Sequence, residues 1–327
     1  MPARSSGRGP EALRRLFSTR TPAFRAVVRT LEKLIDVDVN VLVTGESGSG
    51  KDYVAEALHV CGVRAARPFV RIDCSSIPPD LFESELFGFE KGTFTDAKAN
   101  KPGRLESVRG GTLYLDEIGG IPAALQAKLL RVIEQRQFTR LGGTRPIELD
   151  ARIIASATDL EPRRQGSHSL RGDLLYRLSV VTIELPPLRE RVDDIAALAR
   201  RFARDAAARH HRPRRPLADE TLALLSAYPW PGNVRELASV VDRAVVLEDG
   251  SELTPASLPR ETLLRGDALV ASASRGLWTL AELERRYALA VLDSVGGNGS
   301  RAAKILGISR KTLIEKRRRW GRAERAK

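Results

Sequence analysis

Cysteine is scarce in this chain of 327 residues, which contains only Cys61 and Cys74. Two cysteines cannot form the disulfide framework of a small secreted domain, and no Cys/His spacing suits a metal, so a reducing, cytoplasmic compartment is favoured. Aromatic residues make up only 5% of the chain, and glycine and proline are too few for a collagen-like or low-complexity protein. No run approaches the ~18 apolar residues of a membrane span, and the N-terminus lacks an apolar signal core. Neither export nor a membrane partner is predicted.

Positive charge is what the chain has in excess, with a net charge of +13. Residues 1–20 carry +4 and residues 299–327 carry +9, so the long middle of the chain is neutral overall. A neutral body with one basic end favours a module that binds a phosphate-rich polymer. On composition alone, a solvated cationic tail is an equal alternative.

Short apolar runs alternate with helical stretches between residue 22 and about residue 187. The runs occupy residues 39–43, 69–72, 112–115, 152–155 and 180–183. Such runs between helices predict a buried parallel sheet in an α/β domain. Residues 189–258 lack them and indicate several helices, broken at Pro229 to Gly232, and residues 259–277 have no clear period and are typical of a linker.

A glycine-rich segment follows the first apolar run and precedes a helical stretch. It consists of Gly45, Glu46, Ser47, Gly48, Ser49, Gly50, Lys51 and Asp52. A loop of this kind surrounds a polyphosphate with backbone N–H groups, and Lys51 would reach the β- and γ-phosphates. Asp52 stands where a Ser or Thr usually ligates Mg²⁺. The segment predicts an ATP site.

Two carboxylates, Asp116 and Glu117, end the third apolar run. In ATP hydrolysis Asp116 would hold Mg²⁺, directly or through water, and Glu117 would polarise the attacking water. Such a pair alone is more often structural. Together with residues 45–52 it favours ATP hydrolysis.

These motifs resemble those of the AAA+ bacterial enhancer-binding proteins, which activate sigma-54 RNA polymerase. The resemblance covers about residues 16–327 and rests on six ordered motifs, which include residues 45–52, 83–88, 170–178, 185–191 and 228–237. It implies an AAA+ P-loop ATPase, with a parallel sheet flanked by helices and an α-helical lid. An acidic residue after the loop lysine is usual in this family, which accounts for Asp52.

The resemblance also implies roles for three arginines. Arg171 and Arg177 match the family's arginine fingers, which reach the γ-phosphate held by the neighbouring subunit and so require a ring, usually a hexamer. Arg235 matches the lid sensor that reads nucleotide in its own subunit.

Two positions near the predicted site depart from the family. Asp73 replaces an Asn that holds the catalytic glutamate between active and inactive positions, and an ionised Asp73 would repel Glu117. The switch must then differ, or Asp73 must be protonated. Thr158 lies nearest the first sensor, which is usually Asn. We expect hydrolysis to be retained, and the sequence leaves open how these two positions affect its coupling.

The family's sigma-54-binding loop, GAFTGA, is matched by six residues: Gly92, Thr93, Phe94, Thr95, Asp96 and Ala97. The expected contact residues Phe94 and Thr95 remain. Thr93 replaces Ala, and Asp96 replaces a Gly that supplies flexibility. We expect the loop to engage sigma-54, and the alternative is a degenerate loop that does not.

The basic C-terminus resembles a Fis-type helix-turn-helix. An amphipathic pattern through Leu280, Leu283, Tyr287 and Val291 precedes two short helices at residues 300–306 and 310–319. Arg317 and Trp320 stand where the family has apolar residues, so we expect this end to pack differently. The expected DNA contacts are Arg301, Arg310, Lys311, Thr312, Lys316, Arg317, Arg318 and Arg319.

The sequence as a whole predicts a sigma-54-dependent transcription activator, with ATP and Mg²⁺ as cofactors and with DNA, the polymerase holoenzyme and its own copies as partners. The alternative is a DNA-binding regulator whose ATPase fold serves only assembly. No sensory domain fits before the ATPase, so control is expected from a partner, from expression level or not at all. The predicted division is a disordered basic N-terminus at 1–16, an α/β ATPase subdomain at 17–188, a helical lid at 189–258, a linker at 259–277 and the helix-turn-helix at 278–327.

Overall fold

The computed structural model describes residues 8–17, 19–95, 97–158, 170–259 and 278–324. The chain divides into two compact units. The first comprises residues 1–191 together with 232–235, and the second comprises residues 192–231 together with 236–327.

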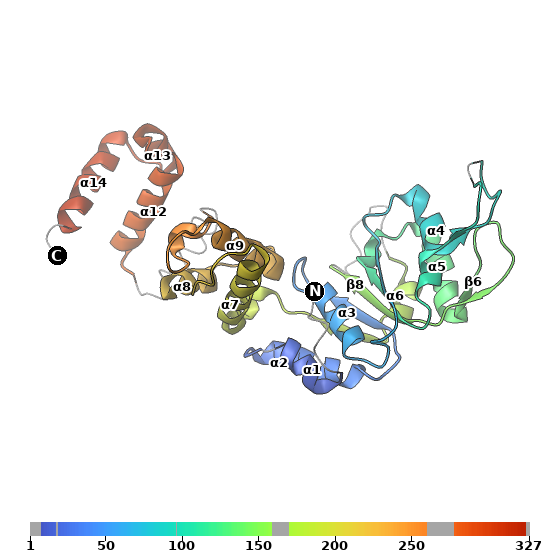
Figure 1. The fold of residues 1–327 in the computed structure, drawn as a ribbon. Coiled ribbons are helices and arrows are strands. Elements are labelled where there is room, and N and C mark those ends of the chain that lie inside the picture. Colours follow the sequence, from blue (N-terminus) through green and yellow to red (C-terminus); the bar gives the residue numbers. More distant parts are fainter. Residues whose placement is uncertain (1–7, 18, 96, 159–169, 260–277, 325–327) are drawn as a thin grey trace. The chain divides into compact units, whose positions relative to one another are not determined.

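A parallel five-stranded sheet forms the centre of the first unit (Figure 1). Its strand order is β2-β5-β8-β1-β9, and all neighbouring strands run parallel. The five predicted runs are confirmed as strands: β1 (Val41–Thr44), β2 (Phe69–Asp73), β5 (Thr112–Asp116), β8 (Arg152–Ala157) and β9 (Val181–Glu184).

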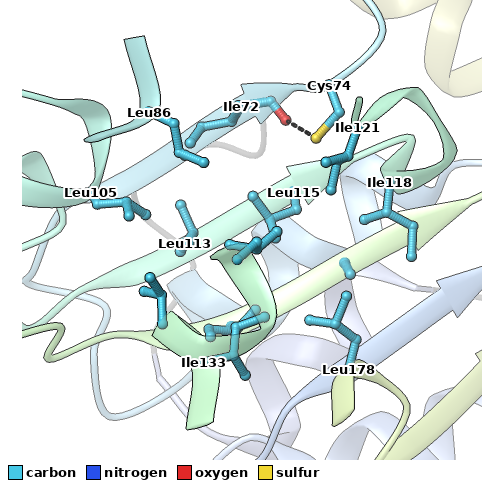
Figure 2. Packing of buried hydrophobic residues seen from close by; sticks show 14 of the residues in the cluster. Ile72, Cys74, Leu86, Leu105, Leu113, Leu115, Ile118, Ile121, Ile133 and Leu178 are labelled. Carbon is cyan, nitrogen blue, oxygen red and sulfur yellow. Dashed lines mark hydrogen bonds between the residues drawn. The ribbon is translucent and has the colours of Figure 1, made fainter. Parts of the chain in front are cut away.

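Both faces of this sheet are buried, because consecutive strand residues point to opposite sides. Leu113 and Leu115 of β5 belong to one apolar cluster, and Tyr114 between them belongs to the other. Figure 2 shows the first cluster, in which Leu86 and Ile133 pack near Leu113 and Leu115. This face is covered by α4 (Pro79–Phe87), α5 (Ala123–Gln135) and α6 (Gly172–Leu178), and the opposite face by α1 (Pro10–Leu16), α2 (Pro22–Leu34) and α3 (Lys51–Val60).

Helix α1 corrects the predicted disorder of residues 1–16, of which 1–7 lie outside the described residues. Ala12 and Leu13 are buried at 4% and 0% exposure in the cluster with α2 and α3. Arg14 remains exposed and donates to the Glu32 carboxylate at 2.5 Å. The arginine-rich composition of residues 1–20 hides this helix, which docks through Ala12, Leu13 and the following Phe17.

Short elements connect the main strands. Two small antiparallel ribbons pair β3 (Gly88–Phe89) with β4 (Lys101–Pro102), and β6 (Gln137–Phe138) with β7 (Ile147–Glu148). Single 3₁₀ turns are η1 (Arg104–Ser107), η2 (Ile118–Gly120) and η3 (Leu188–Glu190). The β3–β4 ribbon carries the predicted sigma-54 loop.

The second unit contains α7 (Val192–Arg209), α8 (Asp219–Ala227), the part of α9 (Asn233–Leu247) from Glu236 onward, and the turn η4 (Pro255–Ser257). The predicted break before α9 is confirmed. Trp230 is fully buried there with φ of 52°, and its indole N–H donates to the Leu225 carbonyl at 2.8 Å. The predicted linker lies outside the described residues except for Pro259.

Three C-terminal helices, α12 (Leu280–Ser294), α13 (Gly299–Ile305) and α14 (Arg310–Glu324), form a small core of their own. The predicted apolar face of α12 is wrong at Leu280 and Tyr287, which are 84% and 44% exposed. The prediction is confirmed at Val291, which is buried together with Ala288 and Leu292, because α13 and α14 pack against that face. Among the described residues, none of the helices is both long and apolar enough to cross a bilayer.

Candidate active site

The glycine-rich loop between β1 and α3 adopts the conformation that its sequence predicts. Gly45, Gly48 and Gly50 have φ of 141°, 75° and 104°, in the left-handed region that favours glycine. A Cβ atom on Gly48 would also lie 2.3 Å from the Gly232 carbonyl oxygen. Glycine is therefore required at position 48 by conformation and by space, and α3 begins directly after the loop at Lys51.

A cavity of about 220 Å³ lies at this loop and at the carboxyl ends of β2 and β5. All but two of its lining residues, Arg71 and Ser75, are predicted from the sequence. The buried hydroxyl of Ser49 in the same loop has no hydrogen-bond partner among the described residues, which suits a polar ligand at the loop. The cavity is lined by Ser47, Gly48, Gly50, Lys51, Asp52, Arg71, Asp73, Ser75, Asp116, Glu117 and Arg235.

Lys51, Glu117 and Thr158 form a hydrogen-bonded cluster at the cavity. The Lys51 ammonium donates to the Thr158 hydroxyl at 2.8 Å and lies 3.2 Å from Glu117 Oε1. The Thr158 hydroxyl donates to Glu117 Oε1 at 2.5 Å, and its backbone N–H donates to Oε2 at 3.1 Å. Both oxygens of the glutamate are thus held by the residue predicted as the first sensor.

The Asp116 carboxylate is fixed from two sides. Oδ1 accepts hydrogen bonds from the Tyr114 hydroxyl at 2.8 Å and from the Ser156 hydroxyl at 2.6 Å, and Oδ2 accepts one from Arg71. Burial opposes ionisation, but the hydrogen bonds from Ser156, Tyr114 and Arg71 outweigh it and lower the pKa of Asp116. Asp116 is therefore an ionised carboxylate, suited to a divalent cation.

Two predicted site residues make contacts that the sequence does not reveal. Asp73 lines the cavity, but its Oδ1 accepts from the N–H and hydroxyl of Ser75 at 3.0 and 2.7 Å, while Thr158 binds Glu117. The Glu46 carboxylate accepts from the Arg189 guanidinium at 2.7 and 2.8 Å and from Asn233 at 3.0 Å. The hydrogen bond from Arg189, followed by that from Asn233, lowers the pKa of Glu46.

The three predicted arginines occupy different places. Arg235 lines the cavity and donates to the Ser47 hydroxyl at 3.2 Å. Arg171 and Arg177 are exposed on and beside α6, and neither is among the described residues that line the cavity. Arg171 makes two hydrogen bonds to Asp173, at 3.1 and 2.9 Å.

Tyr114, Ser156 and Arg71 are polar contacts to Asp116 that sequence reasoning missed. Tyr114 lies opposite Arg71 in the β2–β5 register, and Asp116 lies opposite Asp73. The period-two spacing of these residues is the signal that could have found them, because it puts them on one face of neighbouring strands.

The predicted sigma-54 loop is anchored at its base. The Thr93 hydroxyl lies 2.6 Å from the Glu90 carbonyl oxygen and 2.9 Å from that of Leu141. Phe94 is 45% exposed, and its ring lies edge-on to Phe89 with centroids 4.8 Å apart. Asp96 lies outside the described residues.

The helix-turn-helix exposes four of the eight predicted DNA-contact residues. Arg301, Arg310, Lys311 and Arg317 are exposed, whereas Lys316 forms an ion pair with Glu284 of α12 at 2.6 Å. Ser309 caps α14 by accepting from the Thr312 N–H at 3.0 Å. The side chains of Arg318 and Arg319 lie outside the described residues, and Trp320 packs against the core of the domain.

Three family models match the chain. The sigma-54 interaction domain matches residues 17–184, the AAA+ ATPase lid domain residues 189–274, and the bacterial regulatory protein, Fis family, residues 279–320. The chain belongs to the sigma-54-dependent transcription activators. The lid match includes most of the segment predicted as a linker.

Related proteins of this family align with most of the chain. The transcriptional regulatory protein ZraR of Klebsiella oxytoca is 42% identical over 299 residues, which cover 90% of this chain and 67% of the relative. The DNA-binding transcriptional regulator NtrC of Rhizobium meliloti is 40% identical over 335 residues, covering 92% and 69%.

Solved structures agree with this membership. NtrX from Brucella abortus, solved in complex with ADP, superposes with a TM-score of 0.69 at 34% identity and covers 92% of this chain and 69% of NtrX. Hsp104 shares the fold alone, at a TM-score of 0.55 and 16% identity over 72% of this chain and 46% of that chain. This activator is therefore an AAA+ ATPase that binds nucleotide, acts with sigma-54 RNA polymerase and binds DNA through a Fis-type domain.

Proposed function

We propose that this activator assembles into a hexameric ring, hydrolyses ATP with Mg²⁺ at the cavity of residues 45–52, and remodels the sigma-54 holoenzyme through residues 92–97. The observation that carries the proposal is the cluster of Lys51, Glu117 and Thr158, because it joins the phosphate-binding lysine to the glutamate that would polarise water.

Four residues of the cavity would have a direct part in this reaction. Lys51 would bind the β- and γ-phosphates, and Arg235 would sense nucleotide from the same subunit. Asp116 would hold Mg²⁺, since this ion binds few carboxylates and completes its shell with water and phosphate oxygens. Mg²⁺ would supply positive charge that stabilises the phosphates. The hydrogen bonds from Thr158 would hold the Glu117 carboxylate in position to orient the attacking water.

The proposed arginine fingers require the subunits to assemble into a ring. Neither Arg171 nor Arg177 is among the described residues that line the cavity of their own chain. A guanidinium supplied by a neighbouring subunit would stabilise the charge of the phosphoryl-transfer transition state. Arg171 would first have to break its ion pair with Asp173. Breaking this pair costs little free energy because both side chains are exposed.

The two remaining partners of the proposed activator are sigma-54 and DNA. Phe94 and Thr95 are exposed on the loop and would contact sigma-54. The basic face of α14 would bind upstream DNA, and both partners would meet the activator in the cytoplasm.

Binding to sigma-54 in a transition-state-like complex tests the proposal. Purified activator would be mixed with sigma-54 and either ATP, ADP, or ADP with a metal fluoride, and complex formation would be measured by sedimentation. We expect binding only with the metal fluoride, and none for Lys51→Ala, which should not bind nucleotide. Measurable ATPase without sigma-54 binding would favour the rival, a DNA-binding regulator whose ATPase serves assembly.

A further inference from the structure

Arg71 is a basic residue in an otherwise acidic corner of the nucleotide cavity. It lies in the middle of β2, its side chain is 46% exposed, and it lines the cavity. Its guanidinium hydrogen-bonds Asp116 Oδ2 and lies 3.7 Å from Asp52 Oδ2. A single cation thus bridges the acidic residue of the glycine-rich loop and the acidic residue at the end of β5.

The two oxygens of Asp116 differ in their partners. Oδ1 accepts from Tyr114 and Ser156, which are 1% and 0% exposed and fixed within the sheet. Oδ2 accepts from Arg71, a half-exposed side chain with many rotamers. Oδ2 is therefore the oxygen that a divalent cation, or the water of its shell, would reach by moving only one flexible side chain.

We propose that the Arg71 guanidinium competes with a divalent cation for the place between Asp52 and Asp116 and withdraws when the Mg²⁺-nucleotide complex binds. This inference rests on the proposed Mg²⁺ role of Asp116. The guanidinium offsets the negative charge of the two carboxylates, and repulsion between like charges prevents it from sharing the site with Mg²⁺. Arg71 is then a positioning residue that raises the Mg²⁺ concentration required for nucleotide binding.

Mg²⁺-dependent nucleotide affinity tests this role without relying on hydrolysis. Binding of a fluorescent ATP analogue would be titrated at a series of Mg²⁺ concentrations and in EDTA. We expect Arg71→Gln to lower the half-saturating Mg²⁺ concentration by about threefold to tenfold, because a charged hydrogen bond no longer competes. Arg71→Lys keeps the charge and should restore most of the wild-type requirement. Binding of Mn²⁺, followed by electron paramagnetic resonance, should tighten in parallel in Arg71→Gln.

Matched variants separate this inference from the proposed metal site. Arg67→Gln removes an exposed arginine just before β2 and should leave the Mg²⁺ requirement unchanged. Asp116→Asn should abolish the Mg²⁺ dependence in both the wild-type and Arg71→Gln backgrounds. If Asp116→Asn abolishes it but Arg71→Gln behaves as wild type, the role of Arg71 is wrong and the metal site stands. If Asp116→Asn leaves the dependence intact, the metal site itself is wrong.

A different role for Arg71 would give a different pattern. If the guanidinium bound the phosphates directly, Arg71→Gln would weaken nucleotide binding equally with Mg²⁺ and in EDTA. That result would overturn the inference. Circular dichroism melting of each variant would identify loss of binding caused by unfolding. If Arg71→Gln unfolds, Arg71→Met, which also removes the charge but keeps much of the side-chain length, replaces it in the Mg²⁺ series.

Discussion

Glu117 has a backbone conformation that few non-glycine residues adopt. Its φ and ψ are 52° and 62°, in the left-handed region, which costs a non-glycine residue about 1–3 kcal/mol. Its N–H donates to the Ser156 hydroxyl at 2.9 Å, and Thr158 holds both carboxylate oxygens. Strain at a residue held by so many contacts agrees with a reacting group whose position is set in advance.

Replacing Thr158 tests whether its hydroxyl positions this glutamate. Thr158→Val keeps the shape and the backbone N–H bond to Glu117 but removes the hydroxyl's bonds to Lys51 and Glu117, so we expect kcat for ATP hydrolysis to fall roughly tenfold to a hundredfold. Thr158→Ser keeps the hydroxyl and should retain most of the rate. The measurement is steady-state phosphate release at saturating ATP. Equal rates for the Val and Ser variants would show that the hydroxyl has no catalytic part.

At the scale of elements, the loop on β3 and β4 depends on a neighbouring segment. Thr93, where the family has Ala, hydrogen-bonds the Leu141 carbonyl, and a Cβ atom on Gly142 would lie 2.4 Å from the Thr93 hydroxyl oxygen. The threonine therefore fits against glycine backbone in the segment after β6. This contact restrains the base of the loop while leaving Phe94 and Thr95 exposed.

Thr93→Ala should loosen the loop without removing its contact residues. Loss of one hydrogen bond of about 1 kcal/mol would speed amide hydrogen exchange at residues 92–95 by about fivefold, while sigma-54 binding persists. Thr95→Ala is the matched variant and should abolish sigma-54 binding with exchange nearly unchanged. Hydrogen-exchange mass spectrometry and sedimentation measure the two effects. Unchanged exchange in Thr93→Ala would refute the restraint.

Helix α14 contains basic residues of two kinds. Arg310 is exposed, whereas Lys316 is paired with Glu284. If Arg310 contacts a phosphate, Arg310→Ala should reduce the slope of log affinity against log salt by about 0.9, and Lys316→Ala should reduce it less. Fluorescence anisotropy with a promoter fragment over a KCl series measures both slopes. An equal loss for both variants would mean that Lys316 leaves Glu284 to bind DNA.

The sequence predicted elements better than the contacts between them. Continuous apolar runs located all five strands, because a buried parallel strand is apolar on both faces. Helix α1 was missed because its arginines dominate a short segment whose burial depends on α2 and α3. Arg71 was missed because its partner Asp116 lies on β5, and only the register of β2 against β5 brings the two period-two patterns together. Leu280 and Tyr287 were assigned to the wrong face because that face is chosen by α13 and α14.

At the scale of the whole molecule, the distribution of charge along the chain differs between the DNA-binding domain and the ATPase. The +9 of residues 299–327 lies in the Fis-type domain, where it suits DNA, and the neutral middle is the ATPase. Within the basic residues 1–20, which carry +4, Arg14 forms an ion pair with Glu32 on the surface. ATP hydrolysis, unlike DNA binding, would then need several copies, because the proposed arginine fingers and the cavity belong to different subunits.

Mixing two inactive variants tests this shared site. Glu117→Gln lacks the water-polarising group but keeps both fingers, and Arg177→Ala lacks a finger but keeps an intact cavity. Each alone should hydrolyse ATP at least a hundredfold more slowly than wild type, on the order expected for loss of a general base or an arginine finger. In a random equimolar mixture, roughly a quarter of the interfaces in a cyclic ring would combine an intact cavity with an intact finger.

The mixture should therefore recover roughly a quarter of the wild-type rate per subunit, since each active interface needs one copy of each variant. A mixture of Glu117→Gln with Lys51→Ala is the control, because neither variant has a working cavity. Both mixtures form after subunit exchange at low protein concentration, and phosphate release is measured after reconcentration. Recovery in the first mixture alone establishes that the finger acts in the neighbouring subunit. A rate that stays at the level of the separate variants, in rings shown by sedimentation to contain both, would mean that Arg177 acts within its own chain.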